Sequence, residues 1–223
     1  MILRRIRLVL PLAALAVAAC DAPTIPPEAE AYDFTFQTTP PSVLRWPVGA
    51  TIRVHVAGGE DPARAALLRE AFLEAAAQWE SAVLFGEYRF AEAAAARDAD
   101  VVLFWSGDPV PADTVGCPPE ISGARAVTWS CPHPTVPGRL RPFTVDGEPS
   151  SIRMMVFVQR FEANDPAGLK RVVLHELGHV LGIGRHSPNL DDVMEAHAPV
   201  DRLSLADRAT IQVLYHVEPD ILP

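Results

Sequence analysis

Hydrophobic and polar residues follow two different periods along this chain, and the periods predict a mixture of strands and helices. Residues 51–56 alternate between apolar and polar side chains, which is typical of a half-buried strand. Three further short stretches, rich in apolar residues, are predicted to be strands as well: 99–105, 124–129 and 152–158.

The remaining regular segments show the helical period. A long helix is predicted from the Asp61-Pro62 pair, where the aspartate can act as N-cap, to about Val83. A second helix is predicted after Asp165-Pro166, with the aspartate as N-cap and the proline at the first helical position. The loops between the central strands, 106–123 and 132–150, are rich in proline and glycine.

The second helix carries the most informative motif, His-Glu-x-x-His. His175 and His179 are four residues apart, so they share one face of a helix and can bind one Zn²⁺ at about 2.0–2.1 Å each. Glu176 lies beside the first ligand, where it can deprotonate a water molecule at the metal. Such a motif also arises by chance, but a pair of histidines on an otherwise apolar helix needs a polar partner, and zinc is the simplest one.

The residues after this motif complete a metal site. Gly182 and Gly184 are predicted to end the helix, because glycine readily adopts the left-handed conformation of a C-cap. The chain can then turn back and offer His186 as a third ligand. Three protein ligands leave one position open, which is the arrangement of a catalytic zinc rather than a structural one.

The segment from His175 to Met194 resembles the metzincin zinc proteases, and in particular bacterial relatives of the matrixins. Their pattern is H-E-x-x-H-x-x-G-x-x-H followed by a methionine turn. This chain has one extra residue, because Arg185 occupies the usual third-ligand position and cannot bind zinc. The step of eight residues from His186 to Met194 matches matrixin-like sequences, so the resemblance implies that His186 is still the ligand.

The resemblance covers about forty residues and implies roles for several more. Met194 would pack beneath the zinc without binding it. The chain would end in a helix of the L-S-x-x-D type, in which Ser204 is the N-cap and Asp207 completes an acidic variant of the capping box. We expect the Arg185 guanidinium to point to solvent or to an acid such as Asp191 or Asp192.

The same resemblance implies an α+β fold for residues 42–223, with the α/β/α-like layering of a metzincin catalytic domain. A mixed twisted sheet would be joined by a long N-terminal helix, the active-site helix and a C-terminal helix. A protein or peptide substrate would lie extended beside an edge strand near residues 124–129. The implied activity is a zinc-dependent endopeptidase in which Glu176 is the general base.

Two other functions stay open. The protein could bind zinc in the cell envelope without catalysis, which the arginine at position 185 favours and the intact Glu176 disfavours. It could also be a gluzincin-type hydrolase with an acidic third ligand, for example Glu195 or Asp201. The glycine turn and the spacing from His186 to the methionine disfavour that alternative.

The first 41 residues predict export and attachment. Residues 1–19 combine three arginines with an apolar run too short to span a membrane, as in a signal peptide. They end before Cys20 in a sequence that resembles a bacterial lipobox, which implies a lipid anchor on this cysteine in the cell envelope. A plain secretory signal is the alternative. The proline-rich residues 20–41 are expected to form a flexible tether.

Charge and cysteine content limit the partners. The net charge is −9, and loss of the three arginines of the signal would leave −12, which argues against nucleic-acid binding. We expect a monomer. Cys117 and Cys131 would form a disulfide in an oxidising compartment, and a second metal site with His133 or two free thiols are the alternatives. The remaining histidines are expected to have no ligand role: His55, His197 and His216.

Overall fold

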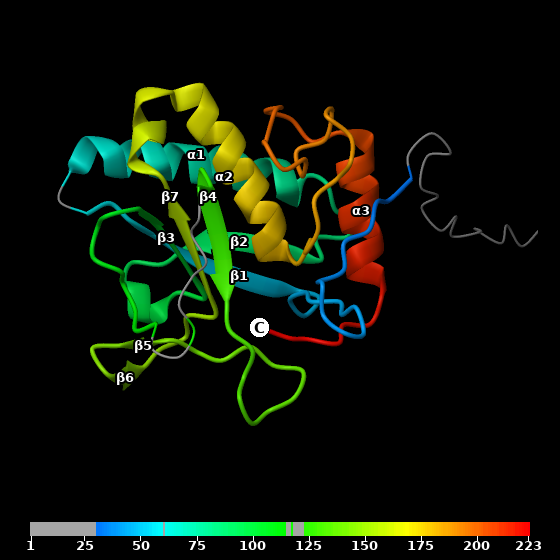
Figure 1. Cartoon of the computed structure of the whole chain (residues 1–223), viewed down its shortest axis with the longest axis horizontal. Coiled ribbons are helices and arrows are strands. Elements are labelled where there is room, and N and C mark those ends of the chain that lie inside the picture. Colours follow the sequence, from blue (N-terminus) through cyan, green and yellow to red (C-terminus); the bar gives the residue numbers. More distant parts are fainter. Residues whose placement is uncertain (1–29, 60, 115–116, 118–122) are drawn as a thin grey trace, which may run out of the picture.

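The computed structural model describes residues 30–59, 61–114, 117 and 123–223. Its centre is a sheet of five strands in the order β2-β1-β3-β7-β4. The first four strands in that order run parallel, and β4 pairs antiparallel with β7 at one edge (Figure 1). The strand bounds are β1 Ala50–Ala57, β2 Tyr88–Glu92, β3 Val101–Trp105, β4 Ala126–Ser130 and β7 Met154–Val158.

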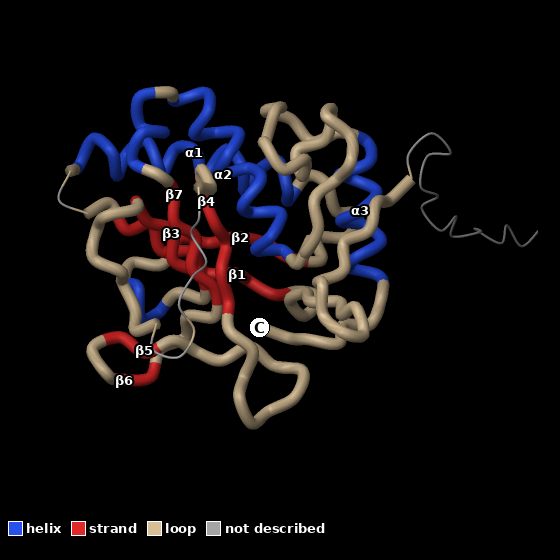
Figure 2. The backbone as a smooth tube through the Cα atoms, viewed as in Figure 1, coloured by secondary structure: helices blue, strands red, loops and turns tan. Residues whose placement is uncertain are grey.

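Three α-helices pack with the sheet around one main hydrophobic core (Figure 2). They are α1 Pro62–Glu80, α2 Pro166–Leu181 and α3 Leu205–His216. Two short 3-10 helices, Ala96–Asp98 and Arg160–Asn164, precede β3 and α2. The helices α1 and α2 lie next to each other over one face of the sheet, and α3 lies at its side (Figure 1).

Alternating side chains of the strands divide the core into two clusters. In β3, Val101, Leu103 and Trp105 join the helices, whereas Val102 and Phe104 join a second cluster on the opposite face. Loop residues cover that second cluster, next to the small hairpin of β5 Thr144–Val145 and β6 Glu148–Pro149. The α+β class and the mixed sheet with three helices are therefore confirmed.

The predicted strands and helices correspond to observed elements with small shifts at their ends. The predicted ranges 51–56, 99–105, 124–129 and 152–158 overlap β1, β3, β4 and β7, and the long first helix ends at Glu80 rather than near Val83. The strand β2 was not predicted, because two of its five residues, Arg89 and Glu92, are charged and it lacks the apolar run that marks β3 and β7. The capping box of Ser204 and Asp207 is present at the start of α3.

Part of the segment assigned to the tether belongs to the folded domain. The backbone N–H of Tyr32 donates to Oγ1 of Thr210 on α3 at 3.1 Å, and its phenol donates to Asp207 at 2.7 Å. The carbonyl of Phe34 accepts from the N–H of Gly184 at 2.8 Å. The predicted boundary at residue 41 is therefore too late. It was placed by proline content, which carries no information on contacts with distant parts of the chain.

The signal, Cys20 and the rest of residues 1–29 lie outside the described part of the chain. Within the described residues, no helix has both the length and the apolar character that crossing a membrane requires.

Candidate metal centre

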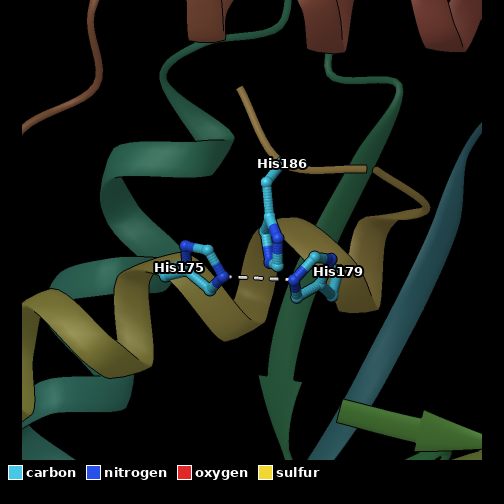
Figure 3. Close-up of side chains that lie close together, drawn as sticks. All are labelled: His175, His179 and His186. Carbon is cyan, nitrogen blue, oxygen red and sulfur yellow. Dashed lines mark hydrogen bonds between the residues drawn. The ribbon is translucent and has the colours of Figure 1, made fainter. Parts of the chain in front are cut away.

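The helix α2 places two imidazoles toward the same point. Nδ1 of His175 lies 2.8 Å from the carbonyl oxygen of Val193, and Nδ1 of His179 lies 2.6 Å from that of Ile183. A carbonyl can only accept a hydrogen bond, so both Nδ1 atoms carry the proton and both Nε2 atoms present a lone pair. These two Nε2 atoms face each other at 3.1 Å (Figure 3). Two lone pairs at that distance repel each other unless a cation lies beside them.

A third imidazole completes the group. His186 comes from the turn after α2 (Figure 3). The centroid of its ring lies 5.2 Å from the ring centroids of both His175 and His179. One ligand atom from each of the three residues lies within 4.8 Å of the others. Tetrahedral zinc with bonds of about 2.0–2.1 Å needs nitrogens about 3.3 Å apart, so small movements of His186 would bring the group to that geometry.

Burial keeps these histidines neutral. Desolvation, assisted by the neighbouring His179, lowers the pKa of His175 to about 3. Desolvation also lowers the pKa of His179 and of the half-buried His186. Only neutral imidazole binds a metal, so the three side chains are in their ligand form at neutral pH.

Two glycines shape the turn between the second and third imidazoles, for different reasons. Gly182 ends α2 in the left-handed conformation, with φ of 113°, as predicted. A Cβ at this position would also lie 1.9 Å from the carbonyl oxygen of Leu44. Gly184 does not adopt a positive φ, so its predicted role was wrong. A Cβ there would lie 2.7 Å from the ring of Phe36, so this glycine makes room for an aromatic side chain.

The extra residue of the motif lies next to an acid outside the imidazole cluster. Arg185 Nε lies 3.0 Å from the carboxylate of Asp33, in the N-terminal segment. An acid was expected beside Arg185 and is present, but it is Asp33 and not Asp191 or Asp192. Asp192 instead accepts hydrogen bonds from the hydroxyls of Ser187 and Ser204, at 2.5 and 2.6 Å.

Glu176 lies beside the imidazoles with its carboxylate buried. Oε2 accepts a hydrogen bond of 2.6 Å from the hydroxyl of Thr128 on β4. Burial raises the pKa of Glu176 to about 7, and the hydrogen bonds from Thr128 oppose that shift. A carboxyl with a pKa near neutrality is suited to taking up and releasing a proton. Thr128 lies in the predicted strand, but no sequence pattern distinguishes its role from that of its neighbours.

The loop after His186 packs against α2 and holds His175 in place. Met194 is fully buried, and its sulfur lies so close to α2 that a Cβ on Gly178 would come within 2.2 Å of it. The buried carboxylate of Asp207 accepts from the backbone N–H groups of Val193 and Met194, at 2.9 and 3.5 Å. The carbonyl of Val193 in turn holds His175. The methionine thus packs against α2 at Gly178, one residue before His179.

A cavity of about 270 Å³ opens beside the metal centre. Its walls come from β4 and the preceding residues 124–125, from residues 196–198, and from Val172, His175, Glu176, His179 and His186. Glu176 is buried and also lines this cavity.

The other predicted residues lie elsewhere. Cys117 and Cys131 form a disulfide at the end of β4, and the hydroxyl of Thr135 and the backbone around it approach His133 rather than a metal site. Neither of the acidic residues considered as a third ligand joins the imidazole cluster: Glu195 contacts the exposed His197, and the carbonyl of Asp201 accepts from Gln78.

Comparison with protein-family models and with curated proteins finds no match to this chain.

Proposed function

We propose that this protein is a zinc-dependent endopeptidase. The observation that carries the proposal is the convergence of three neutral imidazoles on one point, with a buried carboxylate of raised pKa beside them and a cavity in front. All three supposed ligands, His175, His179 and His186, are nitrogen donors, a set that favours zinc among the common metals. The resemblance of the motif to metzincins supports the same class.

Zinc held by the three imidazoles would act as a Lewis acid toward the scissile carbonyl and would acidify a water molecule. Glu176 would accept the proton of that water and then pass it to the leaving amine. Thr128 would hold Oε2 of this carboxylate and leave Oε1 to face the reacting atoms. The described residues provide Oε1 with no hydrogen-bond donor that would compete with the water.

The edge of the sheet supports a peptide substrate. β4 pairs with β7 on one side and has no described strand on the other. An extended peptide could therefore add to this edge and carry its backbone past the metal centre. This mode favours unfolded or flexible protein segments as substrates, because they can offer a free strand. We further propose that the protein is monomeric and works in the bacterial cell envelope, anchored by lipid at Cys20.

The experiment uses the purified protein with and without zinc, and an unfolded protein as substrate. Zinc content is measured by mass spectrometry, and new N-termini report cleavage. We expect Glu176→Gln to retain zinc but lose 10²- to 10⁴-fold in turnover. His186→Ala should weaken zinc binding sharply, whereas the matched control Arg185→Ala should change it little.

Each outcome separates the proposal from its alternatives. Full zinc occupancy without any cleavage by wild type would indicate a zinc-binding protein without catalytic activity. Equal zinc affinity in wild type and His186→Ala, measured by competition with a chelator, would show that the third ligand is another residue.

A further inference from the structure

A second hollow, of about 260 Å³, lies on the other side of the metal centre. It shares Thr128, His179 and His186 with the first cavity, so these three residues separate the two spaces. The walls that belong to the second hollow alone include Ser130 at the end of β4 and Phe36 from the N-terminal segment. A scissile bond at the metal would therefore have one cavity on each side.

Phe36 is held in a defined position. Its backbone pairs with Ser42, with a hydrogen bond of 2.8 Å from the N–H of Phe36 to the carbonyl of Ser42. One face of its ring packs on Gly184, where no side chain would fit. Phe34 and Asp33 bind the same turn through the Gly184 N–H and the Arg185 guanidinium. The aromatic ring is thus fixed to the turn that carries the third imidazole.

The alternation of side chains along β4 suits an extended peptide that adds to its edge. Ala126, Thr128 and Ser130 alternate along β4 and face the α2 side, whereas Val127 and Trp129 face the second core. A peptide added to the edge sends every second side chain toward the same face. One such side chain would enter the first cavity, and another, on the opposite side of the scissile bond, would enter the hollow beside Phe36.

We infer that Phe36 is a specificity-determining residue, the wall of a second substrate subsite that accepts an apolar or aromatic side chain. This inference rests on the proposed function. The partly buried Phe36 gives the hollow an aromatic wall, and Thr128 and Ser130 of β4 line its strand side. A charged substrate side chain would lose hydration there without gaining a partner of opposite charge among the described wall residues.

The test is a cleavage profile of the full-length protein on a peptide library, read by mass spectrometry on both sides of each cleaved bond. Wild type should prefer apolar or aromatic residues at one position on the Phe36 side. Phe36→Ala should flatten that preference and lower kcat/KM for peptides with an aromatic residue there by roughly 10-fold or more, with the other side unchanged. Phe36→Leu should retain an apolar preference but shift its size.

The matched control is Phe34→Ala, which removes a ring from the same segment without touching the hollow. It should lower the melting temperature and leave the cleavage profile as in wild type. An unchanged profile in active, zinc-loaded Phe36→Ala, or the same change in Phe34→Ala, would overturn the inference alone. Failure of zinc-loaded wild type to cut any peptide would overturn the proposed function and this inference together.

Discussion

The hydrogen bond between Thr128 and Glu176 gives the sharpest test of the proposed catalytic arrangement. Thr128→Val keeps the shape of the side chain and removes only the hydroxyl, so Oε2 of a buried carboxylate loses its 2.6 Å donor. Hydrogen bonds to charged groups contribute about 1.5–3 kcal/mol, and 1.4 kcal/mol is tenfold in rate. If this contribution is needed in the transition state, kcat should fall by about 10- to 150-fold.

The assay compares kcat and KM at several pH values with zinc content and the melting temperature. We expect zinc occupancy to change little, because the described hydrogen bonds of Thr128 go to Glu176 and not to the imidazole nitrogens. KM should change less than kcat, because valine keeps the shape of a residue that lines both cavities. Burial raises the pKa of Glu176 and the Thr128 hydrogen bonds lower it, so their loss should raise it further. The acid limb of kcat/KM should therefore move to higher pH, because more of the carboxyl is protonated at any given pH.

Thr128→Ser restores the hydroxyl and should recover most of the activity and the original pH profile. Turnover of Thr128→Val within twofold of wild type, at full zinc occupancy and with an unshifted acid limb, would refute the positioning role. A loss shared equally by the serine and valine variants would point to packing of β4 rather than to the hydrogen bond.

Three further predictions concern stability. Asp207→Ala should lower the free energy of unfolding by about 3 kcal/mol or more and weaken zinc binding, because the N–H groups of Val193 and Ser204 and the phenol of Tyr32 lose their acceptor. A change of less than about 1 kcal/mol in urea unfolding would contradict this. Reduction of Cys117–Cys131, 14 residues apart, should cost about 3 kcal/mol, and unchanged unfolding midpoints with and without reductant would oppose it. In metal-free protein, the lowered pKa of His175 means that the unfolded state binds more protons below pH 6.5, so this side chain by itself contributes a loss of about 2 kcal/mol of stability at pH 5. The raised pKa of Glu176 acts in the opposite sense between pH 7 and 4.5, so metal-free Glu176→Gln should lose more stability on acidification than metal-free wild type, and equal losses would count against these pKa shifts.

The sequence predicts what depends on neighbouring residues. The N-cap at Asp165, the left-handed Gly182 and the capping box at Ser204 each follow from a few adjacent positions, and the structure contains all three. The helical spacing of the imidazole pair belongs to the same kind of local information.

Contacts between distant segments are outside the reach of these patterns. Phe36 and Gly184 are far apart in the chain, and only their packing explains why a glycine is needed where no unusual backbone angle occurs. Asp33 competes with nearer acids for Arg185, and its advantage comes from the path of the N-terminal segment. Thr128 acquires its role because β4 happens to place that residue opposite the carboxylate of α2.

The carboxylate of Asp207 joins three parts of the chain that are separate in sequence. It accepts from the phenol of Tyr32, from the backbone of the loop that holds His175, and from the N–H of Ser204 at the start of its own helix. For the proposed peptidase, a genetic screen for lost activity would consequently score this position as severely as one of the three imidazoles, although Asp207 lies outside the imidazole cluster. Excess zinc separates the two kinds of residue. It should restore activity to a variant of Asp207, in which the three imidazoles are intact but poorly held, and it should not restore activity to a variant that lacks one imidazole.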